Sequence, residues 1–555
     1  MVYHVFLRNS LDTVFYDSEI RKDCLKYTSM LSNECFSFQI AFCVDMEDEE
    51  KNGWNDVIEI EAKVVSGLKN FISVYSVENV PAMRVGYSIG DDWFLRKNPG
   101  LYPDCLKKRR KNHFSAPVGR WKSLWFNVNE ELDNLPSGEH KIAVVFYERA
   151  THRMIAKKEF VLEVMESMLP KQKILATNWV HYDCMGYFSK TKPFSEKFFP
   201  VAENYIRMAV KNGQNMILMP AFTPPLDTPV GEERATAQLV RVSCERGKYS
   251  FDFSLMLKFM KMGDRCGVEY FEHSHLFTQW GAKHAPKIIV HENGKNKKMF
   301  GWQTDASSNE YRSFLHEYLT ALKMFLKENG YENRIFFHIS DEPAKEHLES
   351  YQSASEFMHK ELKGYPSGDA LSDFAFYEKG IVQSPIVVNS EINDFLGRAK
   401  PLWVYYTGYQ CSDYLSNRVI GTPQERGRIL GVQLYYHQIS GFLNWGFNAH
   451  HNRLARLMLD PHVTSDMDAD FVSGTSYLVY PNGDKAEASV RLMTFRDQMQ
   501  DIRAFSLLEE KMGRGFVCSI IEKHIPDISF NCRVTADQLL DLRNEVNWYI
   551  KESEK

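Results

Sequence analysis

The amino-acid sequence predicts an N-terminal β-sandwich, then a (β/α)8 TIM-type barrel, then a C-terminal helical tail. Residues 1–166 contain short runs of alternating apolar and polar residues separated by turn residues, which is typical of an all-β domain. After Leu169-Pro170, short apolar runs alternate with amphipathic stretches as far as residue 485, which favours parallel strands joined by helices. Residues 486–555 carry mixed apolar and charged positions, which predicts helices packed on the barrel.

The strands of the expected sandwich follow one another at short spacing with poor helical periodicity, which favours a sandwich. The predicted strands are Phe36–Phe42, Val57–Ala62, Phe71–Tyr75, His140–Phe146 and Lys158–Val164.

Eight apolar runs in residues 170–485 match the strand count of a (β/α)8 barrel. These strands are Ile174–Trp179, Met216–Pro220, Val268–His273, Ile335–Ile339, Asp373–Phe376, Ile386–Val388, Leu402–Tyr406 and Gly441–Trp445. Predicted helices are Phe198–Asn212, Phe253–Cys266, Tyr311–Glu328 and Lys345–Leu362 within the barrel, and Ala504–Lys511 and Ala536–Lys551 in the tail. The alternative is a doubly wound open sheet, but no glycine-rich phosphate loop supports it.

Composition narrows the functional class. The formal net charge is −5 and no long basic block occurs, so we expect no nucleic-acid partner. The sequence contains no run of about 20 apolar residues, so it predicts no membrane-spanning helix. The first residues lack the layout of a signal peptide, and the ten cysteines are scattered without a CxxC pair. We therefore expect free thiols in a reducing cytoplasm and no metal or other cofactor.

The adjacent acids Asp341 and Glu342 follow the apolar run that begins at Ile335, and Pro343 stops the strand after them. Active-site residues of a barrel lie at the carboxyl ends of its strands. Close packing should raise one carboxyl pKa and leave the other group ionised, which suits a general acid beside an anionic stabiliser. The alternative is structural: Asp341 before Pro343 also resembles the N-cap of the following helix.

Other strand ends carry rings, amides and acids, the composition expected of a saccharide-binding pocket. Candidate binding residues are Asn178 and His181 after the first strand, His273, His275 and Trp280 after the third, Trp403, Tyr405 and Tyr406 on the seventh, and Asn444 and Trp445 on the eighth. The pair His273-Ser-His275 also suggests a metal site, but no strand-eight aspartate accompanies it, so sugar contacts or core packing are favoured. A serine hydrolase is disfavoured because no Gly-x-Ser-x-Gly elbow occurs.

Four stretches in order along the chain resemble glycoside hydrolase family 123, the β-N-acetylgalactosaminidases. His338–Pro343 resembles the catalytic block, and Asn33–Gln39 resembles a sandwich signature. Glu425–Gly431 is similar to the helix before the last barrel strand, and Gly441–Asn448 is similar to that strand. The resemblance spans nearly the whole chain.

The resemblance implies an exo-acting, retaining enzyme that removes non-reducing-end β-GalNAc, with glycosphingolipid glycans as the substrate class. The nucleophile would be the 2-acetamido oxygen of the substrate, an exception to the rule of two catalytic carboxylates. Glu342 would then act as acid and base, and Asp341 would hold the acetamido N–H.

The resemblance implies these binding roles, and the strand pattern suggests which residues fill them. Tyr405 is expected to hold the acetamido oxygen, because Val404 faces the helices; Tyr406 is the fallback. Trp445 would form the floor under the sugar with Trp403 beside it. Arg418, in the loop after strand seven, could read ring hydroxyls or form a structural salt bridge.

Two alternatives stay open. One is an ordinary retaining glycosidase that pairs Glu342 with a distant acid such as Glu272 or Glu391. The other is a non-catalytic carbohydrate-binding protein.

Overall fold

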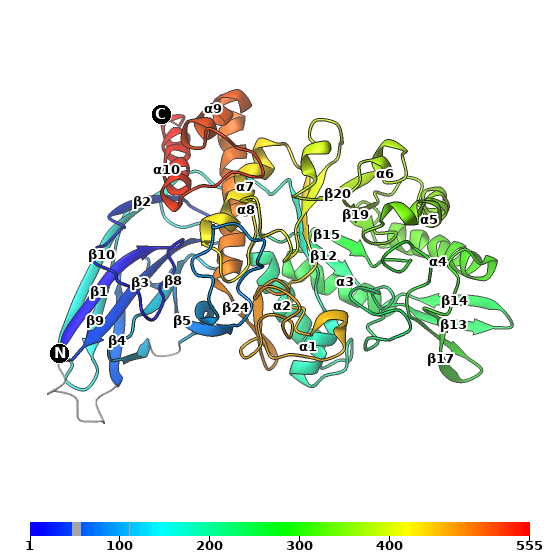
Figure 1. Cartoon of the computed structure of the whole chain (residues 1–555), viewed down its shortest axis with the longest axis horizontal. Helices are drawn as coiled ribbons and strands as arrows, with labels where there is room; N and C mark the ends of the chain where they lie inside the picture. Colours follow the sequence, from blue (N-terminus) through cyan, green and yellow to red (C-terminus); the bar gives the residue numbers. More distant parts are fainter. Residues whose placement is uncertain (47–56, 110–111, 555) are drawn as a thin grey trace.

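The computed structural model describes residues 1–46, 57–109 and 112–554 and has the predicted three-part architecture (Figure 1). A two-sheet β-domain lies at one end, the barrel forms the centre, and the C-terminal helices lie beside both. Over these described ranges, no helix has the length and apolar character needed to cross a bilayer.

Two five-stranded sheets form the N-terminal domain over its described residues, 1–46, 57–109 and 112–166. The first has the order β1 (Val2–Asn9), β3 (Phe36–Asp45), β8 (Lys122–Val128), β5 (Ile72–Ala82), β6 (Gly100–Lys108), and all its pairs are antiparallel. The second has the order β2 (Tyr27–Leu31), β10 (Met154–Met165), β9 (Gly138–Glu148), β4 (Val57–Val65), β7 (His113–Pro117), with β2 parallel to β10. Alternation places one face of each sheet in a shared core, where the rings of Phe38 and Phe126 stack at 4.6 Å.

Eight parallel strands form the barrel. Their order is β11 (Leu175–Asn178), β12 (Met216–Met219), β15 (Tyr270–His273), β18 (Ile335–Phe337), β19 (Gly368–Leu371), β20 (Ser384–Val388), β21 (Trp403–Tyr405) and β22 (Gly441–Asn444). The strands pair as one group of five and one group of three. A bridge from Phe337 to Ser367 joins the two groups on one side. The Asn215 N–H, which donates to the Ala176 carbonyl at 3.2 Å, joins them on the other.

Helices cover the outside of the barrel as the periodicity predicts. They are α1 (Tyr182–Ser189), α2 (Phe199–Lys211), α3 (Ser254–Cys266), α4 (Asn309–Glu328), α5 (Leu348–Glu361), α6 (Ala375–Glu378) and α7 (Gln424–Tyr436). In α4, Ser308 caps the first turn by accepting from the Tyr311 N–H, and one apolar face is buried. Short 3-10 turns are η2 (Lys69–Phe71), η3 (Lys345–His347), η4 (Ile392–Asp394) and η5 (Arg453–Ala455).

The loops carry a small sheet that the sequence reading did not predict. It has the order β14 (Lys248–Asp252), β13 (Arg241–Glu245), β16 (Ile288–Glu292), β17 (Lys295–Phe300) and lies at the far end of the barrel from the sandwich (Figure 1).

The prediction of the fifth barrel strand at Asp373–Phe376 is wrong. That segment leads into α6, which begins at Ala375, and the strand is β19, Gly368–Leu371. The true strand, β19, contains a buried acid, Asp369, and aspartate is rare in strands. The more apolar run at Asp373–Phe376 therefore resembles a strand better than β19 does. The Asp369 carboxylate accepts hydrogen bonds from the backbone N–H groups of Ile339 and Ser340 at 2.9 and 3.1 Å. These bonds pair the backbone donors of the turn that follows β18.

After the hairpin of β23 (Val479–Asn482) and β24 (Lys485–Ala488), three helices complete the chain: α8 (Val490–Met512), α9 (Arg514–His524) and α10 (Ala536–Glu552). Buried ion pairs tie these helices to the sandwich. Arg491 donates to both oxygens of Asp104 at 3.0 and 2.9 Å, and Arg543 donates to Glu34 at 2.7 Å.

Candidate active site

Asp341 and Glu342 lie just past β18, at the carboxyl end of the barrel. The backbone there is held on both sides: the Trp280 N–H donates to the Asp341 carbonyl at 2.9 Å, and the Glu342 N–H donates to the Ala370 carbonyl at 3.1 Å. Glu342 has a φ of 43°, a left-handed conformation that is uncommon outside glycine. The following 3-10 turn has Ala344 at its N-cap, so Asp341 does not cap it.

The pair opens into a pocket of about 730 Å³ at this end of the barrel. Rings and polar groups together form its wall, and they come from several βα loops. Besides the acid pair, the lining includes Trp179, His181, Asp227, Gln279, Trp280, Ser372, Glu391, Tyr405, Tyr409, Trp445 and Phe471.

The surroundings favour the protonated forms of both acids. Asp341 is partly open to solvent and Glu342 more so, yet the protein around them removes much of their hydration. Burial, followed by the charges of Glu342 and Asp369, raises the pKa of Asp341 well above its usual range. Burial also raises the pKa of Glu342. The expectation that only one of the two would be raised is therefore too simple; the pair holds protons to higher pH than isolated carboxyls do.

Tyr405 connects the seventh strand to the acid pair. Its hydroxyl donates to Oε1 of Glu342 at 2.7 Å, and this bond partly offsets the effect of burial on the Glu342 pKa. Burial and the Glu342 charge raise the pKa of Tyr405 well above its usual range, so the hydroxyl stays a donor. Tyr405 and Glu342 both line the pocket at this point.

A buried imidazole supports the pair from below. His338 lies 3.0 Å from Glu272 and 3.5 Å from Asp369. Burial disfavours its charge, but the two neighbouring carboxylates prevail and raise the pKa of His338 to about 9. The charged imidazole lowers the pKa of Asp341, opposing the larger effect of burial.

His181, Trp280, Tyr405 and Trp445 are the predicted binding residues that line the pocket. Arg234 donates to Nδ1 of His181 at 3.0 Å, so Nε2 carries the proton and donates to the Trp445 carbonyl at 2.9 Å. Burial and the Arg234 charge lower the pKa of His181 to about 4, which keeps the imidazole neutral.

Four predicted residues face the helices instead of the pocket, because side chains alternate along each strand. Nε2 of His273 is hydrogen-bonded to the hydroxyl of Tyr318 in α4 at 2.7 Å. The ring of Tyr406 packs on that of Phe442, with 5.3 Å between the ring centroids. Asn178 and Asn444 also face outward.

Arg418 holds these two asparagines together. Its guanidinium donates to the side-chain oxygens of Asn178 and Asn444 and, at 2.8 Å, to the Gly446 carbonyl. Burial lowers the pKa of Arg418 to about 10. Arg418 is expected from the sequence either to bind ring hydroxyls or to form a structural salt bridge. The geometry matches a structural role, in which the partners are amides and a carbonyl and not a carboxylate.

Trp403 and His275 point inward but lie below the pocket floor. Trp403 is 1% exposed and stacks on Phe336 at 5.0 Å. His275 stacks on His338 at 4.6 Å in the barrel interior. Direct contact with a bound sugar is therefore not proposed for these two residues.

Several lining residues could not be predicted from the sequence because they lie in long loops without a strand pattern. Gln279 is one residue before the predicted Trp280, while Tyr409 and Phe471 come from distant loops and pack together at 4.9 Å. Of the two alternative acids, Glu391 lines the pocket. Glu272 is fully buried and accepts from Thr177, Trp179 and His338.

A (β/α)8 barrel with paired acids at a strand end and a ring-lined pocket is an architecture typical of glycoside hydrolases. Residues 179–508 match the family model described as glycoside hydrolase 123, catalytic domain. The chain therefore belongs to glycoside hydrolase family 123, as the four sequence blocks indicated.

One solved structure agrees with the fold over its whole length, and a second is only weakly similar. A family 123 glycoside hydrolase from Clostridium perfringens, studied for glycolipid glycan hydrolysis, superposes with a TM-score of 0.72 at 12% identity, covering 100% of this chain and 98% of that one. A family 39 glycoside hydrolase from Bacteroides cellulosilyticus WH2 gives 0.32 at 9% identity, covering 89% and 83%. A search of curated protein sequences finds no match.

Proposed function

We propose that this protein is an exo-acting, retaining β-N-acetylgalactosaminidase that uses the 2-acetamido group of its substrate as nucleophile. The observation that carries the proposal is the Asp341–Glu342 pair, held side by side on an open pocket with Tyr405 bonded to Glu342. Family membership supports the reaction class, and the glycolipid glycans cleaved by the Clostridium perfringens enzyme support glycolipid glycans as the substrate source.

In the first step the acetamido carbonyl oxygen attacks C1 and forms an oxazoline-type ring. The bond from C1 to the glycosidic oxygen breaks, and Glu342 gives its proton to the leaving oxygen. Asp341 accepts a hydrogen bond from the acetamido N–H, which orients the group and stabilises the positive charge on the ring. The raised pKa of Glu342 favours its role, because the acid must be protonated when substrate binds.

In the second step water attacks C1 from the face that the aglycone left. Glu342, now a carboxylate, takes a proton from this water, and the C1–O bond of the oxazoline ring breaks. The product is β-configured GalNAc with its acetamido group restored. Two inversions at C1 give retention of configuration.

The pocket supplies binding groups for this reaction. Trp445 offers a ring face for the apolar side of the sugar, and Trp280 lies at the rim with 41% of its surface exposed. Tyr405 is placed to exchange its bond to Glu342 for one to the acetamido oxygen. His181, neutral and fixed by Arg234, helps to hold Trp445 through its backbone carbonyl.

A second candidate function is ordinary two-carboxylate retention, and one observation favours it: Glu391 lines the same pocket as Glu342. Aryl β-glycosides that differ at C2 and C4 separate the two mechanisms. Substrate assistance predicts hydrolysis of the GalNAc and failure on the matched galactoside. Efficient cleavage of the galactoside would contradict it, and a faster rate on the GlcNAc compound would overturn the galacto preference.

A further inference from the structure

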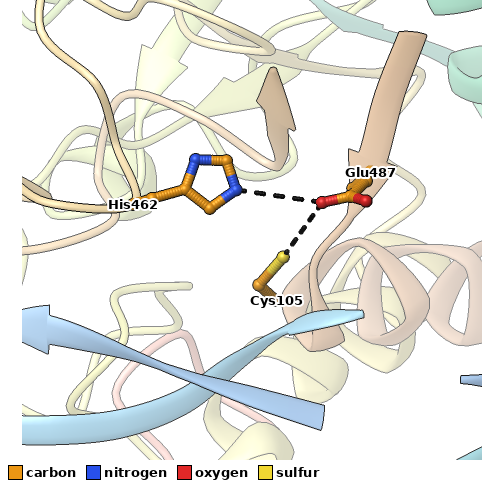
Figure 2. A group of neighbouring side chains, drawn as sticks. All are labelled: Cys105, His462 and Glu487. Carbon is orange, nitrogen blue, oxygen red and sulfur yellow. Dashed lines mark hydrogen bonds and ion pairs between the residues drawn. The ribbon is translucent and has the colours of Figure 1, made fainter. Parts of the chain in front are cut away.

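A second group of reactive side chains lies outside the pocket, where the sandwich meets the barrel (Figure 2). Cys105 comes from β6 of the sandwich, His462 from the loop after β22, and Glu487 from β24. One ligand-type atom from each lies within 4.8 Å of the others. A backbone bridge between Cys105 and Ser489 fixes β6 beside the end of β24, so the fold itself brings the group together.

The contacts within this group are long, a thiol hydrogen bond and a histidine ion pair that both end on one oxygen of Glu487, and this spacing suits a shared cation. Nε2 of His462 and Sγ of Cys105 each lie 3.8 Å from Oε2 of Glu487. Direct N–H···O bonds cluster near about 2.9 Å. Ligands on a tetrahedral zinc ion, with bonds of about 2.0–2.3 Å, lie about 3.3–3.6 Å from one another. For the two distances to Glu487 an ion would need to shorten the spacing by only a few tenths of an ångström, while the third pair, Cys105 with His462, lies within 4.8 Å.

Neighbouring groups occupy the other polar atoms and leave these three facing each other. Asp460 lies 2.9 Å from Nδ1 of His462, so Nε2 is the atom left for a ligand role. Asn482 donates to Oε1 of Glu487 at 2.8 Å, which leaves Oε2 directed at the cysteine and the histidine. A carboxylate behind a histidine is the usual outer support of a metal-bound imidazole.

Charge and donor type also fit zinc. A thiolate and a carboxylate bring two negative charges, which balance one Zn²⁺, and the thiol proton leaves for solvent on binding. A sulfur and an imidazole nitrogen select zinc over Ca²⁺ or Mg²⁺, which take oxygen ligands. The exposed Lys107 lies near Glu487 and opposes a cation, whereas Asp460 on the other side favours one.

Another group of similar composition is a weaker candidate. His275, His338 and Asp369 lie close together beneath the active site. The oxygens of Asp369 already accept from two backbone N–H groups and from Tyr351, and Nε2 of His338 is bonded to Glu272. These bonds belong to the support of the acid pair described above.

We propose that Cys105, His462 and Glu487 bind one zinc ion, with water at the fourth position, and that this ion fastens the sandwich to the barrel. None of the three lines the catalytic pocket, so the role is in stability. The solvent side is open, because the His462 side chain is 36% exposed. Sequence reasoning expected no metal, since the three ligands are far apart in the chain and form no spacing motif.

The test uses the full-length protein without an affinity tag, stripped with chelator and then titrated with zinc. Metal content by mass spectrometry should reach one zinc per chain. His462→Asn and Glu487→Gln should each weaken binding at least about tenfold, and Asp460→Asn about 10- to 100-fold. The control His291→Asn changes an exposed histidine elsewhere on the surface and should bind like the parent.

Cobalt provides a second readout, since a thiolate ligand gives Co²⁺ a charge-transfer absorption band. The parent should show this band and Cys105→Ser should lose it. If Cys105→Ser does not fold, the two variants at less buried positions still decide the outcome. A parent chain that binds zinc no tighter than about 10 μM overturns the proposal. So does a His462→Asn variant that binds zinc as tightly as the parent.

Discussion

Replacing Glu342 by glutamine removes the acid's proton while leaving the shape of the site nearly unchanged. The Tyr405 hydroxyl, which donates to Oε1 at 2.7 Å, can donate equally to the amide oxygen. The protonated carboxyl and the amide are both neutral acceptors, so the strength of this hydrogen bond should change by at most about 1 kcal/mol and the fold should persist. Loss of general acid catalysis should cost about 10²- to 10⁴-fold, which corresponds to about 2.7–5.4 kcal/mol of barrier.

The assay compares leaving groups. For methyl β-GalNAc, whose aglycone must be protonated, kcat/KM of Glu342→Gln should fall by the full factor. For the dinitrophenyl glycoside, which departs without a proton, kcat/KM should fall less than about tenfold. Glu346→Gln, an exposed acid in the same loop, is the matched control and should behave like the parent. An equal loss on both substrates would refute the assignment of Glu342 as the acid.

The same variant tests the electrostatics of the pair. Burial and then the Glu342 charge raise the pKa of Asp341. Asp341 must be ionised to accept the acetamido N–H, so activity rises as the pH passes upward through its pKa. While Glu342 is protonated it carries no charge, so glutamine should leave the acidic limb in place. The parent loses activity at higher pH as Glu342 ionises, and the residual activity of Glu342→Gln should lack this basic limb. A basic limb that persists in the variant would show that Glu342 is not the group whose ionisation stops the reaction.

Three further variants test the site and the scaffold. Asp341→Asn should lose trapping of the oxazoline by added nucleophile and about 10²-fold or more of kcat; an unchanged rate removes Asp341 from the mechanism. Asp104→Ala leaves the buried Arg491 without its carboxylate and should lower the free energy of unfolding in urea by about 3–5 kcal/mol. The control Asp17→Ala, at an exposed pair, should cost at most about 1 kcal/mol, and equal losses would contradict the argument. Gly441→Ala places a Cβ 2.2 Å from the indole on β21, so its thermal midpoint should fall markedly; a parent-like midpoint would show that this packing yields easily.

The order of the elements could be predicted from the sequence because hydrophobic periodicity reports it directly. Seven of the eight barrel strands lie where an apolar run predicts them. The fifth does not, since Asp369 in β19 is stabilised by the backbone of a turn that is distant in sequence. A buried charge of this kind is visible only after the chain has folded. For the same reason the loop sheet from β13 to β17 was missed, as its strands are short and half-exposed.

The candidate site could be predicted only to the level of strand ends. Alternation explains which residues then reach the pocket: Tyr405 points inward, whereas Tyr406 points to the helices. How deep a side chain lies in the barrel also decides whether it reaches the pocket, and hydrophobic periodicity does not report this depth. Trp403 also points inward but occupies the layer below Tyr405, where it fills the barrel interior against Phe336.

The sequence blocks that indicated the family have two different physical roles. In Asn33–Gln39, Glu34 accepts from Arg543 of α10. In Glu425–Gly431, Arg426 donates to both oxygens of Asp91 at 2.8 Å, and Arg428 donates to both oxygens of Asp501.

Those two blocks therefore join the sandwich, the barrel and the C-terminal helices, and they lie away from the pocket lining. A likeness in them argues for the architecture and carries no information about the substrate. The block around Asp341 and Glu342 is the one that places acids on the pocket. Evidence for the reaction must accordingly come from variants of that block, and evidence for the sugar from the pocket wall around Trp445.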